Sequence, residues 1–442
     1  MSNWTLTPHS DEIVVIPDVE VWTATATREH VDVFIRNGRL VDLKPAAARM
    51  NRRARLVLMP SAVDTQVHLR TPGQPEKETP ETGLNAALYG GVGALLTMPN
   101  TKPIMDSVGV MELAERELDR AARLTGVAVY LSVAGTIGQK GVEVAPLESL
   151  AAAGARAVTD DGKGVSDDAV QLEIFKRIEA LNLPFLQHAE TLGAPGPLAD
   201  GPVTRALGLK PYGPEHETDM VARDLRLLKS TPGARYHLLH TSAKGSIALV
   251  KEAKEQGLRV TAEVSPHHLY FSSDDIREDE TSFKMNPPIR SSEDREALID
   301  ALASGAIDWV ATDHAPHDRE SKAKPFSEAT FGTLGLETMV PVVLDLVSRG
   351  RLSPTRAVQV LSTEPARFLG LEDEFGHLKL GQPLRAILVQ PDESWVVQAS
   401  THRSLSKNTC FDGVQLKGKV VGQCSRSGVW LADDRVLTER RS

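Results

Sequence analysis

The chain has 442 residues, of which 41% are hydrophobic and 25% are charged, as in a soluble globular protein. Its formal net charge of −9 argues against a nucleic-acid or membrane-surface partner, because both favour a basic surface. The sequence has no apolar run long enough for a transmembrane helix, no N-terminal signal pattern and only two cysteines, Cys410 and Cys424. We therefore expect a cytoplasmic protein in which any metal is held by histidine and carboxylate side chains.

Both ends of the chain are predicted to be rich in β-strands. Residues 1–60 contain short apolar or alternating runs, and Asn37-Gly38 is a typical hairpin turn. The segment that follows residue 380 has similar strand-like runs. We expect residues 1–60 and 380–442 to form one small β-sandwich, assembled from the N- and C-terminal segments.

Residues 61–379 contain eight apolar runs of strand length that alternate with helical stretches. The predicted strands are residues 61–68, 93–98, 128–135, 155–160, 183–188, 235–240, 259–265 and 307–313. Between them, residues 106–125 and 243–257 carry apolar residues at helical spacing, and Ser353-Pro354 is a typical helix start. This alternation predicts an α/β fold in which residues 61–379 form a (β/α)8 TIM-like barrel.

Polar side chains follow six of the predicted strands at the point where each strand ends. They are Gln66, His68, Arg70, Asn100, Asp160, Asp161, His188, Glu190, His240, Asp313 and His317. A single histidine at such a position is usually structural, but unrelated surface residues have no reason to fall at the same end of successive strands. Because the active site of this barrel lies at the C-terminal strand ends, the set of His68, His188, His240 and Asp313 is predicted to bind a metal.

Histidine and carboxylate ligands suit Zn²⁺ or a similar cation, which lowers the pKa of a bound water to about 7. Asp313, after the last strand, is suited to take a proton from that water and to deliver it to a leaving nitrogen. An aspartate after the fourth strand that bridged two ions would allow a binuclear site. Arg70, Asn100 and His317 add cation and amide donors, which suit a substrate with a carboxylate.

Several motifs, in this order along the chain, resemble those of dihydroorotase, in the longer bacterial class I branch of the amidohydrolase superfamily. They are His68-Leu69-Arg70, Met98-Pro99-Asn100-Thr101, Thr159-Asp160-Asp161-Gly162, Asn286-Pro287-Pro288-Ile289-Arg290, Asp313-His314-Ala315-Pro316-His317, Phe331-Gly332-Thr333-Leu334-Gly335-Leu336-Glu337-Thr338 and Ser406-Lys407-Asn408-Thr409. The resemblance implies reversible hydrolysis of dihydroorotate to N-carbamoyl-L-aspartate in de novo pyrimidine biosynthesis, by metal-bound hydroxide with Asp313 as general base and acid.

The resemblance also implies a role for each matching residue. The implied ligands of one or two Zn²⁺ ions are His68, Asp161, His188, His240 and Asp313, with Asp161 bridging. The implied substrate contacts are a carboxylate clamp of Arg70, Asn100 and His317, and ring contacts from Asn286, Phe331 and Gly332. Residues 314–332 resemble a mobile loop that closes over substrate. We further expect a homodimer and a complex with aspartate transcarbamoylase.

One residue departs from the family pattern. The family has His-x-His at the end of the first strand, whereas this chain has Gln66-Val67-His68. A glutamine amide oxygen is a poor replacement for imidazole on zinc, so we expect one weakened metal position. Two alternatives therefore stay open: a non-catalytic dihydroorotase-like subunit that scaffolds aspartate transcarbamoylase, and a hydantoinase- or allantoinase-type cyclic amide hydrolase. The five other ligand positions and the complete clamp favour an active dihydroorotase.

Overall fold

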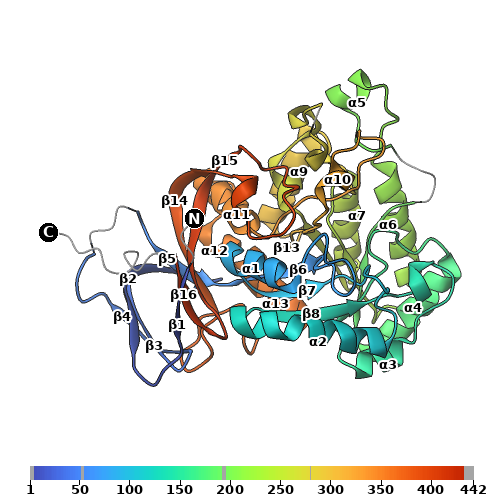
Figure 1. Ribbon diagram of the computed structural model, residues 1–442. Helices are drawn as coiled ribbons and strands as arrows, with labels where there is room; N and C mark the ends of the chain where they lie inside the picture. The colour runs from blue at the N-terminus through green and yellow to red at the C-terminus, as the bar shows by residue number, and fades with distance from the viewer. Residues whose placement is uncertain (1–3, 51–53, 192–195, 279, 433–442) are drawn as a thin grey trace.

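The fold is taken from a computed structural model, which describes every residue except 1–3, 51–53, 192–195, 279 and 433–442. Parts of the predicted terminal domain, at 1–3, 51–53 and 433–442, therefore lie outside the described residues. Two eight-stranded sheets organise the rest of the chain. One is surrounded by helices, and the other lies beside it and contains strands from both ends of the chain (Figure 1).

The first sheet is parallel and forms a nearly closed barrel. Its neighbouring strands are, in order, β6 (Ala62–Val67), β7 (Val92–Thr97), β8 (Ala128–Val133), β9 (Ala157–Val158), β10 (Pro184–Gln187), β11 (Arg235–Leu238), β12 (Val260–Val264) and β13 (Trp309–Val310). A parallel bridge between Val67 and His314 brings the two edges together just beyond β13. The predicted (β/α)8 fold and its eight strands are confirmed.

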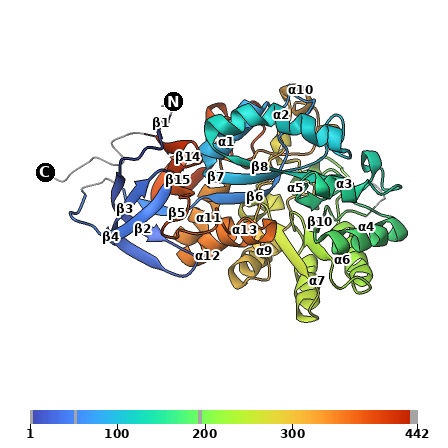
Figure 2. The same ribbon diagram turned by 90° about the horizontal axis from the view of Figure 1, so that it is seen from below.

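Helices cover the outside of the barrel (Figure 2). In chain order, the described α-helices are α1 (Pro80–Gly90), α2 (Val108–Thr125), α3 (Leu147–Ala152), α4 (Asp168–Leu181), α5 (Pro202–Ala206), α6 (Glu215–Leu228), α7 (Lys244–Glu255), α8 (Pro266–Tyr270), α9 (Ser292–Ser304), α10 (Arg319–Lys322), α11 (Met339–Ser348), α12 (Pro354–Val358) and α13 (Glu364–Leu369), of which α5 projects from one end (Figure 1). The start of α12 is as predicted, because the side chain of Ser353 accepts a hydrogen bond from the backbone of Arg356. None of the described helices is long and apolar enough to cross a membrane.

The second sheet joins the two ends of the chain. Its strand order is β1 (Thr5–Pro8), β16 (Gly428–Leu431), β15 (Gln415–Cys424), β14 (Ala386–Val396), β5 (Val57–Pro60), β2 (Val14–Trp22), β3 (Thr27–Arg36) and β4 (Arg39–Pro45). Asn37 and Gly38 both have positive φ, at 49° and 66°, as a tight hairpin turn between β3 and β4 requires. The sheet has a hydrophobic cluster of its own, which includes Ile16, Val33 and Leu388.

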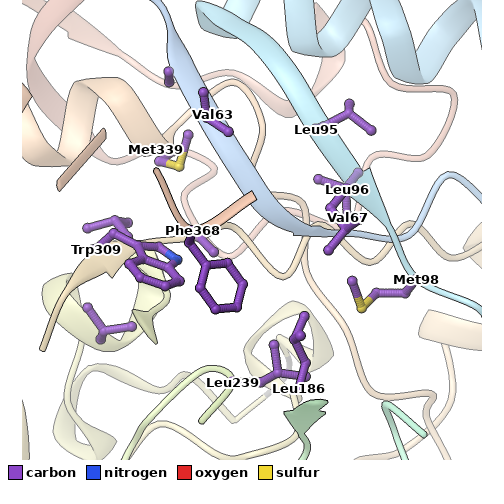
Figure 3. Packing of buried hydrophobic residues seen from close by; sticks show 14 of the residues in the cluster. Val63, Val67, Leu95, Leu96, Met98, Leu186, Leu239, Trp309, Met339 and Phe368 are labelled. Carbon is purple, nitrogen blue, oxygen red and sulfur yellow. The ribbon is translucent and has the colours of Figure 1, made fainter. Parts of the chain in front are cut away.

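Apolar side chains of the barrel strands and of the helices around them pack closely in the main hydrophobic core (Figure 3). Trp309 of β13 and Phe368 of α13 lie 4.8 Å apart between ring centroids. His237 stacks on Trp309 and lies 3.0 Å from a carboxylate oxygen of Glu263, with both side chains fully buried. His237 is therefore part of the core. This rigid packing fixes the strand ends that carry the polar residues.

Candidate active site

One cavity at the C-terminal ends of the barrel strands contains every residue that the sequence predicted for the site. Its volume is about 180 Å³, and it is lined by His68, Arg70, Asn100, Asp161, Gly162, His188, His240, Asn286, Asp313, Ala315, His317, Phe331 and Gly332. The wall is contributed by segments that follow β6, β7, β9, β10, β11, β12 and β13. A cavity of this size suits a small, compact ligand rather than a polymer.

Three buried side chains converge on one side of the cavity. His188 Nδ1 lies 3.5 Å from Asp161 Oδ1, and His240 Nε2 lies 3.6 Å from the same oxygen. The two histidine nitrogens are 2.9 Å apart. Candidate ligand atoms of these three residues all lie within 4.8 Å of one another. This is the spacing at which one cation can contact all three.

The chemistry of this group fits a divalent cation. Burial raises the pKa of Asp161, but hydrogen bonds from His188 and His240 outweigh this effect and hold it well below its usual range. Burial likewise lowers the pKa of His188, but hydrogen bonds to Asp161 and Glu190 raise it to about 10. Asp161 and Glu190 thus keep the His188 ring protonated and positively charged where it faces Asp161. A metal cation can take the place of that proton.

His68 and Gln66, from β6 and its C-terminal end, approach the same group from the other side. His68 Nε2 lies 3.2 Å from Asp161 Oδ2 and 3.2 Å from Asp313 Oδ1. Gln66 Nε2 donates a hydrogen bond of 3.1 Å to Asp161 Oδ1, the oxygen that also faces His188 and His240. Gln66 Oε1 is buried and has no hydrogen-bond partner among the described residues. Gln66 therefore faces Asp161 with its amide N–H, a donor that cannot ligate a cation.

The two aspartates after β9 face different surroundings. Asp160 accepts hydrogen bonds from the backbone of Gly135 and Thr136, at 2.8 and 3.1 Å, and from the Thr136 hydroxyl. Asp161 lines the cavity. The structure thus places Asp161 with the histidines and uses Asp160 to hold the loop after β8.

Arg70 and His317 form a second pair of side chains that lines the cavity. Arg70 Nη2 lies 3.1 Å from His317 Nε2, and Arg70 Nε donates to Pro316 O at 3.2 Å. Burial lowers the pKa of Arg70 to about 10, which still leaves it charged at neutral pH. Burial and the nearby charges of Arg70, Lys77 and Lys322 lower the pKa of His317 to about 2. His317 is therefore neutral, and Arg70 carries the positive charge of this pair.

Three residues of the cavity wall have strained backbone conformations. Arg70, His240 and Asp313 have φ values of 57°, 30° and 48°, in the left-handed region that non-glycine residues rarely adopt. Each such residue costs about 1–3 kcal/mol and persists only where the surrounding structure fixes it. All three lie two or three residues after the end of a barrel strand, where the chain leaves the barrel.

Glu190 also contacts the site, and its presence after the fifth strand did not by itself predict a role for it. Its Oε2 lies 3.1 Å from His188 Nε2 and accepts a hydrogen bond of 2.8 Å from Asn286 Nδ2. An acceptor at Nε2 keeps the proton there and leaves Nδ1 of His188 free for a cation. Glu190 thus connects a candidate metal ligand with a candidate substrate contact. The only sequence signal for it is its place two residues after His188.

Comparison with known proteins agrees with this geometry. The profile of the family described as "Dihydro-orotase-like" matches residues 55–246. A dihydroorotase of Bacillus licheniformis is 39% identical over 383 residues, which cover 84% of this chain and 88% of that protein. Dihydroorotases of Bacillus caldolyticus and Syntrophotalea carbinolica are 40% and 37% identical over 82% and 89% of this chain, and over 84% and 92% of their own lengths.

Solved structures of more distant proteins share the fold. L-hydantoinase from Arthrobacter aurescens superposes with a TM-score of 0.81 at 24% identity, covering 96% of both chains. Dihydropyrimidinase from Brevibacillus agri gives a TM-score of 0.79 at 20% identity, covering 95% of both chains. At these identities the likeness concerns the fold of the barrel and its neighbouring sheet.

Proposed function

The chain belongs to the dihydroorotase family and is a cyclic amidohydrolase, and we propose that it interconverts dihydroorotate and N-carbamoyl-L-aspartate. One observation carries the proposal: a single small cavity is lined both by the buried candidate metal ligands Asp161, His188 and His240 and by the charged Arg70. Dihydroorotate needs both groups, because it has a ring amide to be hydrolysed and a carboxylate to be bound. Arg70 can bind that carboxylate through two parallel hydrogen bonds.

We assign the metal to Asp161, His188 and His240, with His68 and Asp313 on the other side of Asp161. Zn²⁺ is the cation that this donor set suits best, and when bound it would acidify a coordinated water. Asp313, 3.2 Å from His68, is placed to take the proton of the attacking water. The same carboxyl group returns that proton to the leaving ring nitrogen. In the reverse reaction Asp313 acts in the opposite order.

The remaining candidate residues orient the substrate. Asn100 Oδ1 lies 2.8 Å from His68 Nδ1, so the Asn100 amide donors stay available to the substrate carboxylate beside Arg70. Asn286 uses its amide donor on Glu190, while its Oδ1 is buried without a hydrogen-bond partner among the described residues. A ring N–H of the substrate would satisfy that oxygen. The backbone at Phe331 and Gly332 closes the cavity on this side.

We propose that one zinc ion is bound per chain. The group of Asp161, His188 and His240 is complete, whereas the position beside His68 has Gln66 where the family has a histidine. The Gln66 amide instead donates to Asp161. Loss of a residue that only supports a metal ligand already lowers metal affinity by about 10- to 100-fold. We therefore expect the position beside His68 to bind zinc more weakly by at least this factor.

The test measures the turnover of a panel of substrates by the purified protein, together with the zinc content of that protein. We expect turnover of dihydroorotate, and of N-carbamoyl-L-aspartate in the reverse direction, with about one zinc per chain. Turnover of hydantoin or allantoin without turnover of dihydroorotate would identify a hydantoinase-type enzyme instead. Failure to hydrolyse any of these would support the non-catalytic subunit, whose proposed complex with aspartate transcarbamoylase can be tested by co-elution. The proposed homodimer can be tested by light scattering.

A further inference from the structure

The side chain of Asn408 connects the two segments that form one wall of the cavity. It lies between β14 and β15, and it is 6% exposed. Its Oδ1 accepts a hydrogen bond of 3.1 Å from the backbone N–H of His317. Its Nδ2 donates to the carbonyl of Ala315 at 3.0 Å and to the carbonyl of Gly332 at 3.1 Å. One carboxamide therefore holds both ends of the loop 314–332.

The backbone beside Asn408 strengthens the same connection. The carbonyl of Asn408 accepts hydrogen bonds of 3.2 Å from the N–H of Leu334 and from the hydroxyl of Thr333. That hydroxyl in turn accepts a bond of 3.0 Å from the N–H of Cys410. These contacts fix the distance between residues 408–410 and the segment that follows Gly332.

Lys322, at the C-terminal end of α10, holds Gly332 from the other side. Its Nζ donates to the carbonyls of Thr330, Gly332 and Lys284 at 2.9, 3.0 and 3.2 Å. The N–H of Gly332 donates to Lys284 O at 2.9 Å. Both polar groups of Gly332 are thus paired inside the protein, and its carbonyl accepts from Asn408 and from Lys322.

Gly332 has little freedom to move from this position. Its φ is 136°, and a Cβ added there would lie 2.8 Å from Ala315 Cβ and 3.0 Å from the His317 ring. A small displacement of this segment would therefore change the shape of the cavity and the place of His317. In a buried site, a shift of about 1 Å can cost about 100-fold in rate or binding.

We propose that Asn408 and Lys322 are positioning residues that hold Gly332 and His317 against the substrate. This inference rests on the proposed function, because it assigns the affinity for dihydroorotate partly to a residue outside the barrel strands. Asn408 makes its side-chain hydrogen bonds with Ala315, His317 and Gly332 and so acts on the clamp side of the cavity, away from Asp161, His188 and His240. A change at Asn408 should therefore weaken substrate binding and leave the metal in place.

Two variants and a control test the proposal. Asn408→Asp keeps the size of the side chain and an acceptor for the N–H of His317, but it places oxygen opposite the carbonyls of Ala315 and Gly332. Lys322→Met keeps the aliphatic chain and removes all three bonds of the amine. Ser406→Ala is the matched control, because Ser406 lies in the same segment but bonds to Lys77 O at 2.7 Å, outside the loop.

We expect each of the two variants to raise KM for dihydroorotate by roughly 10- to 100-fold, with kcat within about threefold of wild type and zinc content unchanged. Backbone amides of residues 315–334 should exchange hydrogen faster in both variants and at the wild-type rate in Ser406→Ala. Should Asn408→Asp fail to fold, Lys322→Met alone decides the question.

Wild-type KM and wild-type amide exchange in the folded variants would overturn the inference, as would a loss of zinc at unchanged KM. A wild-type protein that does not turn over dihydroorotate would refute the proposed function instead. In that case faster exchange at residues 315–334 would still support the positioning role of Asn408 and Lys322, and unchanged exchange would still overturn it.

Discussion

Replacing Glu190 by glutamine removes one charge from the outer side of His188 and changes little else. Glu190 Oε2 lies 3.1 Å from His188 Nε2 and accepts a bond of 2.8 Å from Asn286. Burial raises the pKa of Glu190, but its hydrogen bonds with His188 and Asn286 lower it below the usual value. The carboxyl group is therefore ionised at neutral pH, and the glutamine variant lacks that negative charge.

The expected cost of Glu190→Gln follows from this geometry. A carboxylate that accepts the outer N–H of a ligating histidine raises the basicity of the ring, and its loss costs about 10- to 100-fold in metal affinity. This range corresponds to about 1.4–2.7 kcal/mol. Asn286 loses the same anionic partner, so KM for dihydroorotate should rise together with the dissociation constant for zinc.

The assay is a competition for zinc between the metal-free protein and a coloured chelator at neutral pH. Glu173→Gln is the matched control, because Glu173 pairs with Arg177 on the surface of α4, away from the cavity. A zinc dissociation constant of Glu190→Gln within about twofold of wild type would refute the role given to Glu190 and weaken the assignment of His188 as a ligand.

Four further changes test separate parts of the site and the fold. Gln66→His should raise zinc from one to two ions per chain by elemental analysis, and an unchanged count would show that Gln66 does not limit the second position. Asp313→Asn should lower kcat by about 10²–10⁴-fold, and a kcat within tenfold of wild type would remove Asp313 from proton transfer. Arg70→Lys keeps the positive charge but loses the forked guanidinium that can bind a carboxylate through two hydrogen bonds, so KM for dihydroorotate should rise by roughly tenfold while zinc content stays constant. An unchanged KM would contradict the role of Arg70 in binding the substrate carboxylate. Burial raises the pKa of Asp224 to about 6. Between about pH 4 and pH 6 this carboxyl group is ionised in the unfolded chain but still protonated in the folded one, so the folded wild-type protein loses stability as pH rises through this range. Between about pH 4 and pH 8, the unfolding free energy of Asp224→Asn should therefore rise relative to that of wild type by at most about 3 kcal/mol. Urea denaturation measures this difference, and a difference that does not change with pH would contradict the raised pKa of Asp224.

The sequence was sufficient for the barrel and for the residues that gather in its cavity. Each strand is a short apolar run, and a parallel barrel brings all C-terminal strand ends to one face, so His68, His188 and Asp313 could be grouped without coordinates. The choice between Asp160 and Asp161 is clearer in the structure, where Asp160 bonds to the loop after β8 and Asp161 lines the cavity.

Other features depend on contacts between distant segments, which a single sequence does not reveal. Asn408 bonds to Gly332 and Ala315 across 76 and 93 residues, and its motif gave no hint of these partners. The protonation state of His317 could not be read from the sequence, because burial and neighbouring positive charges from other segments keep it neutral. The positive φ of Arg70 is likewise imposed by the packing around it and by no local sequence preference.

The central claim is that this chain hydrolyses dihydroorotate with a metal held by Asp161, His188 and His240. The most direct measurement follows dihydroorotate hydrolysis while zinc is removed by a chelator and then returned in counted amounts. We expect activity to disappear with the metal and to return at about one zinc per chain. Full activity in the metal-free protein, or no activity at any zinc content, would contradict the assignment of this metal.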